Sequence, residues 1–293
     1  MQTYIDSISF KELSLKDMPK GLQQLPNPPQ KLYYCGSCEA LNNLLESNLA
    51  VSTTHKATQT ITSKPISQIA PKIAIVGSRK PNPYTKSFVA TLATRIAKHS
   101  GIVVSGGALG VDIIAHTYAF PRTIMFSPAG LDIIYPKSNA KMIKQMMEQA
   151  LVMSEYDKGY MPHQYSFLDR NRLVIGLSDY VVIPQADMMS GSMQSARIAM
   201  KLNKPLFVLP HRIGESEGTN HLLAQGKAQG IYNIDDFIES IFGASVSRCD
   251  DEVLLFCANN PSFEEAFARF GEKIYEYELE GKIMRESGTI RVP

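Results

Sequence analysis

The chain has 293 residues, of which 44% are hydrophobic and 20% are charged, an ordinary composition for a globular protein. It has no run of about 18 apolar residues, and Met1 to Asp6 lack the basic start and apolar centre of a signal peptide. We therefore expect a cytoplasmic protein without a membrane partner. The net charge of +2 hides an uneven distribution: residues 72–230 carry 18 Lys and Arg against 10 Asp and Glu, and residues 250–293 carry 5 against 10. The middle of the chain therefore suits a polyanionic partner, and the C-terminal part does not.

The cysteines give little sign of a disulfide framework or a metal site. Cys35 and Cys38 have the spacing of a zinc or redox motif, but no second cysteine pair follows at a suitable distance. His55 is an isolated candidate ligand in a polar tract. We expect reduced thiols, no metal and no cofactor.

Residues 1–71 are predicted to form an N-terminal arm and a polar loop. The segment from Leu25 to Pro29 contains three prolines and cannot be helical, whereas Lys31 to Tyr34 can pair as a short strand. The stretch 52–64 is rich in Ser and Thr and has no hydrophobic period, which indicates a mobile loop or an insertion.

From Lys72 onward, short runs of β-branched residues alternate with segments of helical spacing. The predicted strands are 73–76, 102–104, 123–126, 151–153, 180–183 and 206–209. Buried strands separated by crossover helices predict an α/β fold. We expect a Rossmann-like domain over 72–245, with a mostly parallel, doubly wound sheet.

Small, hydroxyl and basic residues follow several of these strands. In a doubly wound sheet the ligand crevice lies outside the carboxyl ends of the strands, so these residues are predicted to meet at one rim. Glycines allow the backbone to approach a ligand, and helix N-termini and guanidinium groups bind phosphate. The residues concerned are Gly77, Ser78 and Arg79 after the first strand, Ser105, Gly106 and Gly107 after the second, Ser190, Gly191 and Ser192 after the fifth, and His211, Arg212 and Gly218 to Asn220 after the sixth.

A dinucleotide does not fit this rim. The glycines after the second strand read Gly-Gly-x-x-Gly, which is not the dinucleotide spacing. The third strand ends in Phe126-Ser-Pro128, where a carboxylate for the ribose is expected.

The segment Tyr160 to Arg172 combines aromatic rings with an amide and arginines. Arginine binds phosphate bidentately and a ring supports a base, so the segment suits single-stranded nucleic acid. The alternative is that the arginines pair with carboxylates such as Glu155 or Asp169 and that the phenylalanine belongs to the core. The candidate contacts are Gln164, Phe167, Arg170, Asn171 and Arg172.

A catalytic pair is harder to find. Asp112 and His116 are four residues apart and share a helix face, but the aspartate lies in the first turn, where it can cap backbone N–H groups. Ser105 has no visible partner for nucleophilic catalysis. We expect no catalytic residues.

Read in series, these motifs resemble the DNA-processing protein DprA (Smf) family over about Pro28 to Ile241. The motifs are Ala74 to Arg79, Val104 to Asp112 with Ala115-His116, Gly130 to Asp132 with Tyr135-Pro136, Ser154-Glu155, Phe167 to Arg172, Ser190-Gly191 and Gly218 to Asn220. The resemblance implies a Rossmann-like core that binds single-stranded DNA, protects it during natural transformation, loads the RecA recombinase and forms a homodimer. Family binding positions fall on Arg79 and its loop, Gly106, Gly107, Phe167 and Arg170 to Arg172.

Two positions depart from the family pattern. The family usually has Ser-Gly-Leu-Ala where this chain has Ser105 to Ala108, and it often has Pro-Gly where this chain has Pro210-His211. A sterile-alpha-motif domain, found N-terminally in some members, is not evident.

Residues 250–293 are predicted to form a small winged-helix-like domain of helices and a hairpin around Ser287-Gly288. Its second helix carries glutamates that meet phosphate unfavourably: Glu272, Glu276, Glu278 and Glu280. We expect this domain to bind protein or to pack on the core, and not to read DNA.

The main alternative function is a Rossmann-like nucleotide phosphoribohydrolase. That chemistry needs a glutamate on the helix after the fifth strand, and Pro184 to Gln194 contains none. A scaffold of the DNA-uptake machinery with incidental DNA affinity is a third reading. The sequence favours a non-enzymatic single-stranded DNA-binding mediator.

Overall fold

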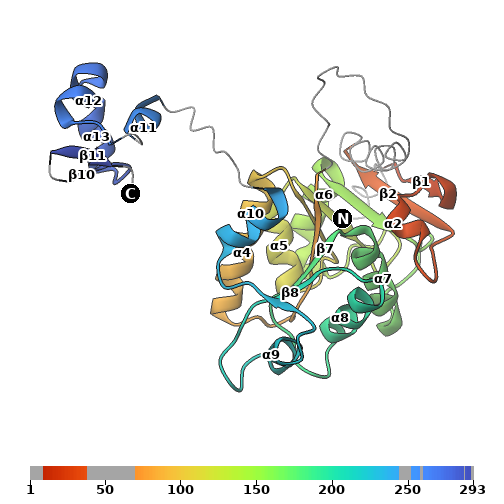
Figure 1. Ribbon diagram of the computed structural model, residues 1–293. Helices are drawn as coiled ribbons and strands as arrows, with labels where there is room; N and C mark the ends of the chain where they lie inside the picture. The colour runs from red at the N-terminus through yellow and green to blue at the C-terminus, as the bar shows by residue number, and fades with distance from the viewer. Residues whose placement is uncertain (1–8, 38–69, 244–251, 258–259, 287, 292–293) are drawn as a thin grey trace, which may run out of the picture. The chain divides into compact units, whose positions relative to one another are not determined.

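The computed structural model describes residues 9–37, 70–243, 252–257, 260–286 and 288–291. The chain divides into two compact units, Met1–Ile241 and Phe242–Pro293 (Figure 1). No helix within the described ranges is both long and apolar enough to cross a membrane.

The first unit is built on a nine-stranded sheet in the order β1-β2-β6-β5-β4-β3-β7-β8-β9. The strands from β3 to β9 pair in parallel, whereas β1 and β2 add an antiparallel edge at β6. The strands are β1 (Lys11–Ser14), β2 (Lys31–Gly36), β3 (Lys72–Ile75), β4 (Ile102–Ser105), β5 (Thr123–Phe126), β6 (Leu151–Ser154), β7 (Tyr180–Ile183), β8 (Leu206–Val208) and β9 (Gln229–Gly230).

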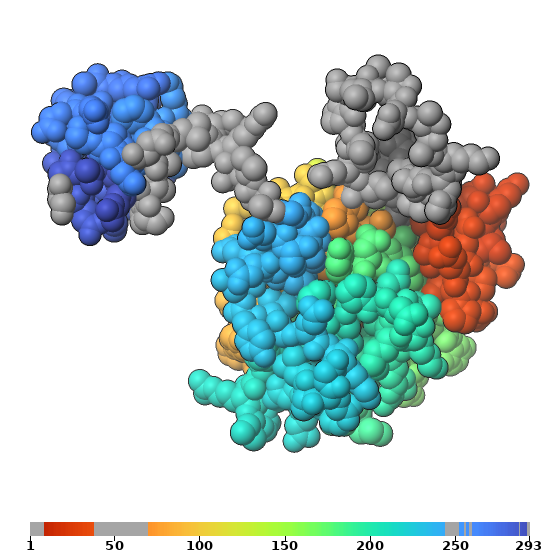
Figure 2. Space-filling view, in the orientation of Figure 1, coloured from red at the N-terminus to blue at the C-terminus, as the bar shows by residue number. Residues whose placement is uncertain are grey.

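Helices cover both faces of this sheet, as the alternation of strands and helices predicts. Helices α4, α5 and α6 pack on one face, and α2, α7 and α8 pack on the other. Figure 2 shows residues of α7 and α8, in green to teal, and residues around α10, in blue, on one face of the unit. The helices are α2 (Lys20–Gln23), α4 (Pro83–Lys98), α5 (Val111–Ala119), α6 (Ala140–Gln149), α7 (Gln164–Leu177), α8 (Gly191–Lys201), α9 (Glu217–Ala224) and α10 (Ile234–Phe242), with short 3-10 helices at Leu15–Asp17 and Lys137–Asn139.

The strand order contains a switch point at β3. From β3 the chain runs outward through β4, β5 and β6, then crosses back to lay β7 on the opposite side of β3. Ala74 in β3 aligns with Val104 in β4 and with Val181 in β7. The connection after β3 runs through α4 on one face of the sheet, and the connection after β7 runs through α8 on the other face. A crevice therefore opens at the carboxyl ends of β3 and β7. The predicted mostly parallel, doubly wound α/β sheet is confirmed.

The described part of the predicted N-terminal arm belongs to the sheet itself. Leu13, Met18, Leu22 and Leu32 are buried in the same core cluster as β3, β7 and α7. Apolar burial therefore joins residues 9–37 to the domain predicted to begin at Lys72. The Ser- and Thr-rich stretch 52–64 lies outside the described residues.

In the part of the second unit that the structure describes, three short helices and a hairpin surround a core of their own. The elements are α11 (Glu252–Cys257), α12 (Phe263–Phe270), α13 (Lys273–Leu279), β10 (Met284–Glu286) and β11 (Thr289–Arg291). Val253, Ala266, Ile274 and Ile290 are buried together. The predicted helices and hairpin are present, and the winged-helix assignment stays a prediction.

Candidate functional site

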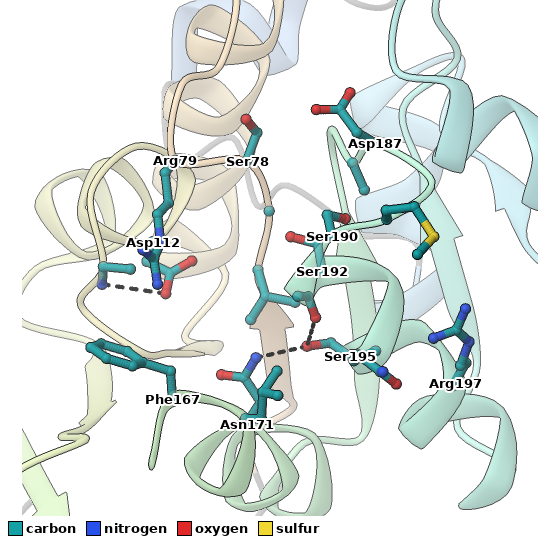
Figure 3. A pocket seen from close by; sticks show the side chains of 18 of the residues that line it. Ser78, Arg79, Asp112, Phe167, Asn171, Asp187, Ser190, Ser192, Ser195 and Arg197 are labelled. Carbon is teal, nitrogen blue, oxygen red and sulfur yellow. Dashed lines mark hydrogen bonds between the residues drawn. The ribbon is translucent and has the colours of Figure 1, made fainter. Parts of the chain in front are cut away.

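A cavity of about 890 Å³ lies at the switch point of the sheet (Figure 3). The segment after β3 (76–80), the first half of α7 and the segment from Ala186 into α8 line it. Ten of the nineteen residues that the sequence places at the rim or in contact with nucleic acid line the cavity: Gly77, Ser78, Arg79, Gln164, Phe167, Arg170, Asn171, Ser190, Gly191 and Ser192.

Backbone hydrogen bonds hold the loop after β3 in place. Ser78 N donates to the Gln185 carbonyl at 2.8 Å, and Val111 N donates to the Ser78 carbonyl at 3.1 Å. The first N–H of α5 is therefore used within the protein and does not face a ligand. The loop is fixed between β7 and α5, which positions the exposed side chain of Arg79.

Arg79 lies over an aromatic ring at the cavity wall. Its guanidinium carbon is 5.2 Å from the centre of the Phe167 ring, and that ring is 5.5 Å from Tyr135. Phe167 is half-buried, so the alternative that it belongs wholly to the core does not hold. The pair offers a cation next to an apolar face, as Figure 3 shows.

Helices α7 and α8 present polar groups from adjacent turns. Gln164, Phe167 and Asn171 are spaced by three and four residues, so they share one face of α7. Asn171 Nδ2 donates to Ser195 Oγ at 3.0 Å, which links the two helices. Ser190 caps α8 by accepting a hydrogen bond from Met193 N at 3.3 Å.

A buried ion pair forms the inner wall of the cavity. Arg170 is 2% exposed and Asp112 is 6% exposed, with Nη1 and Oδ2 3.9 Å apart. Burial raises the pKa of Asp112 and lowers that of Arg170, and each charge opposes the shift of its partner. Arg170 Nε and Nη1 lack hydrogen-bond partners among the described residues.

Nine of the predicted residues do not line the cavity: Ser105, Gly106, Gly107, Arg172, His211, Arg212 and Gly218 to Asn220. Ser105 is buried and donates to the Ile75 carbonyl at 2.6 Å. Gly106 and Gly107 pack against Arg170 and Met125, respectively. Arg172 Nη2 lies 2.5 Å from Glu155 Oε2, the ion pair that the alternative interpretation of this arginine predicts.

Sequence reasoning missed several lining residues on α8 and before it. Gln194 and Arg197 lie four and seven residues after the predicted contact Ser190, so a helical period counted from Ser190 indicates both of them. Lys80 follows Arg79 directly. Asp187 and the exposed Met189 come from a loop without a recognisable pattern.

The Asp112 and His116 pair is not arranged for catalysis. His116 is fully buried, and its Nδ1 lies 2.6 Å from Thr123 Oγ1. Burial lowers the pKa of His116 to about 3. Its side chain lies outside the cavity lining, so it cannot reach a ligand there.

Cys35 of the cysteine motif is not among the residues that line the cavity. Cys35 is buried against α6, and burial raises its pKa to about 12. Cys38 and His55 lie outside the described residues. Within the described ranges, no three His, Cys, Asp or Glu side chains gather to hold a metal.

Comparison with curated proteins connects the chain to a family. The model of DNA recombination-mediator protein A matches residues 63–242. The chain is 31% identical over 215 residues to Protein Smf of Synechocystis, covering 72% of this chain and 48% of that protein. It is 35% identical over 161 residues to DNA processing protein DprA of Streptococcus pneumoniae, covering 53% and 57%. The chain spans about half the length of these curated relatives.

Solved structures agree with this assignment. DNA processing protein A from Helicobacter pylori is 47% identical, with a TM-score of 0.69 over 80% of this chain and 97% of that chain. DprA from Streptococcus pneumoniae is 29% identical, with a TM-score of 0.65 over 78% and 74%. The family model covers more than half of the chain, and the chain therefore belongs to the family of DNA recombination-mediator protein A.

Proposed function

We propose that the cavity at the switch point binds single-stranded DNA without catalysing a reaction on it. The observation that carries this proposal is the Arg79 guanidinium over the half-buried Phe167 ring, at the wall of a cavity built from three segments. A phosphate binds the cation and a base packs against an apolar ring, which is how proteins hold single strands without reading sequence. The similar protein from Helicobacter pylori has been described with a unique single-stranded DNA binding mode, which supports this ligand.

The charges of the lining also favour a strand of DNA. Arg79, Lys80 and Arg197 are exposed cations, whereas Arg170 is largely neutralised by Asp112. The exposed cations suit phosphates on the solvent side of a strand. The hydroxyl, amide and apolar side chains of the lining suit bases and sugars.

The lining does not favour the phosphoribohydrolase alternative. No glutamate lies among the described lining residues, and the carboxylates present are Asp112, paired with Arg170, and Asp187. An acid or base for release of a nucleobase must lie within hydrogen-bond reach of the reacting atoms. Free base released from nucleoside monophosphates by the purified protein would contradict the proposal.

Replacing Arg79 by Ala tests the DNA site directly. The variant loses a phosphate partner and the charge over Phe167, so we expect roughly tenfold weaker binding to single strands. We also expect the slope of log K against log salt concentration to become smaller in magnitude by about one. Fluorescence anisotropy over a salt series, with single and double strands, measures both quantities.

Two variants control this measurement. Arg79→Lys retains the charge and keeps most of the affinity, while Arg122→Ala removes an exposed arginine at the opposite, amino end of β5 and leaves binding unchanged. Equal affinity of Arg79→Ala and the unchanged protein would refute the assignment of this cavity.

The cellular role we propose follows the family resemblance. The protein protects incoming DNA during natural transformation, acts as a homodimer and loads RecA, and its C-terminal domain contacts protein. The family description as a recombination mediator supports this role. RecA assembly on strands pre-coated with single-strand-binding protein is expected to accelerate with the unchanged protein and not with Arg79→Ala.

A further inference from the structure

A second cavity, of about 640 Å³, opens beside the first at the same end of the sheet. It lies between the N-terminus of α4 and the loop that follows β8. Its lining is Asn82, Pro83, Tyr84, Pro210, His211, Arg212 and Glu215. None of these residues lines the first cavity, although His211 and Arg212 are among the residues that the sequence places at the rim.

The β8 loop is held by the half-buried side-chain amide of Asn220. Asn220 Oδ1 accepts a hydrogen bond from His211 N at 3.1 Å, and Asn220 Nδ2 donates to the carbonyls of His211, Arg212 and Glu215 at 3.1 to 3.3 Å. A loop fixed by four such bonds presents its side chains in a preformed arrangement.

The inner wall of this cavity contains a buried imidazole with an unused nitrogen. The His211 side chain is fully buried, and its Nε2 lies 2.8 Å from the Pro184 carbonyl, to which it donates. Nδ1 has no hydrogen-bond partner among the described residues, and Glu215 Oε2 lies 3.7 Å away. A buried polar atom without a partner is costly, so it marks a place where a ligand can supply one.

The mouth of the cavity carries the groups that hold a nucleotide. Tyr84 is 55% exposed, and its ring is nearly perpendicular to the His211 ring, with the ring centres 5.7 Å apart. More than half of the tyrosine is therefore accessible to a ligand. Arg212 is exposed and provides a cation for phosphate. The Glu215 carboxylate accepts hydrogen bonds from ring N–H or amino groups of a base.

We propose that this second cavity is a nucleotide subsite that takes the continuation of a single strand held in the first cavity, with Tyr84 stacking on a base and Arg212 contacting phosphate. The inference rests on the proposed function. The two cavities adjoin: Lys80 lines the first and Asn82 lines the second, and two residues span at most ~7 Å. Gln185 accepts hydrogen bonds from Ser78 N and Asn82 N, so one residue anchors both loops.

Oligonucleotide length separates the two cavities in an experiment. Strands of about 4 and about 12 nucleotides are titrated against the full chain, its Tyr84→Ala and Arg212→Ala variants, and Arg79→Ala. We expect Tyr84→Ala and Arg212→Ala to weaken binding of the long strand about fivefold or more and to leave the short strand unaffected. Arg79→Ala weakens binding of both strands.

Matched controls exclude general effects of the substitutions. Tyr84→Phe keeps the ring and binds the long strand as the unchanged protein does. Tyr232→Ala removes another exposed tyrosine and Arg122→Ala another exposed arginine, and neither changes long-strand affinity.

The outcomes distinguish this subsite from the first cavity. Unchanged long-strand affinity in both Tyr84→Ala and Arg212→Ala, or an equal loss for short and long strands, overturns the subsite while the first cavity stands. Failure of the unchanged protein to bind either strand overturns the proposed function itself.

Discussion

The Arg170 guanidinium occupies the space that a side chain at position 106 would need. An ideal Cβ on Gly106 would lie 1.0 Å from Arg170 Nη1, so only glycine allows the buried pair with Asp112 to form. Removing one partner of such a pair leaves a buried charge and costs about 3–5 kcal/mol. Arg170 therefore shapes the cavity wall more than it attracts DNA.

Residue type alone did not separate this arginine from its neighbours. Arg79, Arg170 and Arg172 were all predicted as DNA contacts, yet one is exposed, one is buried against Asp112 and one pairs with Glu155. The sequence identifies the cations, but their partners come from α5 and from the segment after β6. Only the tertiary fold brings those partners close.

The buried side chain of His116 is expected to make the protein less stable in mild acid. The Thr123 hydroxyl donates to the Val103 carbonyl, so His116 Nδ1 donates to Thr123 Oγ1. Burial lowers the folded pKa to about 3 from 6.5, so the stabilisation is complete above pH 6.5 and is lost as the pH falls toward 3. Lowering the pH from 7 to 5 therefore reduces the free energy of unfolding by about 2 kcal/mol through this group alone.

Urea denaturation at the two pH values measures this effect. The His116→Asn variant keeps a donor near Thr123 but does not titrate, so its pH-dependent loss is expected to be about 2 kcal/mol smaller. His221→Asn, which replaces an exposed histidine, serves as the control. An identical pH dependence in His116→Asn and the unchanged protein would contradict the neutral, buried state of His116.

At the scale of elements, α2 and α7 meet through two glycines. A Cβ on Gly21 would lie 2.4 Å from the Gly176 carbonyl oxygen, and a Cβ on Gly176 would lie 2.8 Å from Leu25. This close approach lets the N-terminal segment bury Leu22 and Leu25 in the main core.

Gly21→Ala therefore tests the attachment of the N-terminal segment. Alanine favours a helix by about 1 kcal/mol over glycine, but here the backbone contact forces α2 away from α7, and we expect destabilisation of about 1–3 kcal/mol in urea. Gly191→Ala, whose new Cβ would meet only Leu168 at 3.8 Å, is the matched control. Equal stability of the two variants would show that α2 does not depend on this contact.

The same elements show what sequence patterns predict and what they omit. All six predicted strands of the parallel sheet are present, because buried central strands need continuous β-branched runs such as Ile102 to Val104. The edge strands β1 and β9 carry no such pattern, since an edge strand is only partly buried. The role of Gly21 was also missed because a glycine at a helix contact has no local signature.

At the scale of the whole molecule, topology explains why the position of the cavity was predictable. The switch point depends only on strand order, and the carboxyl-end loops of β3 and β7 carry Arg79 and Ser190. The cavity position therefore follows from the sequence, whereas Ser105, Gly106 and Gly107 do not line the cavity and their contact with DNA stays a prediction. Ser105, Gly106 and Gly107 pack within the protein, which strand order cannot reveal.

The C-terminal unit is expected to add nothing to single-strand affinity. Its cations are largely paired with its own glutamates: Arg269 with Glu252, Lys282 with Glu280, Arg285 with Glu278 and Arg291 with Glu286. Residues 250–293 carry a net charge of −5, from 5 basic and 10 acidic residues. Phosphates approaching this unit meet unpaired acidic groups more often than free cations.

Deleting residues 250–293 checks this expectation. We expect the remaining chain to bind single strands within about threefold of the full chain at physiological salt, and slightly more tightly at low salt, because a repulsive charge is gone. Anisotropy titrations at both salt concentrations measure the change, and circular dichroism verifies that the first unit, with its own core, stays folded. A loss of affinity of tenfold or more would show that this unit contacts the strand despite its charge, and would place part of the DNA site outside the sheet's switch point.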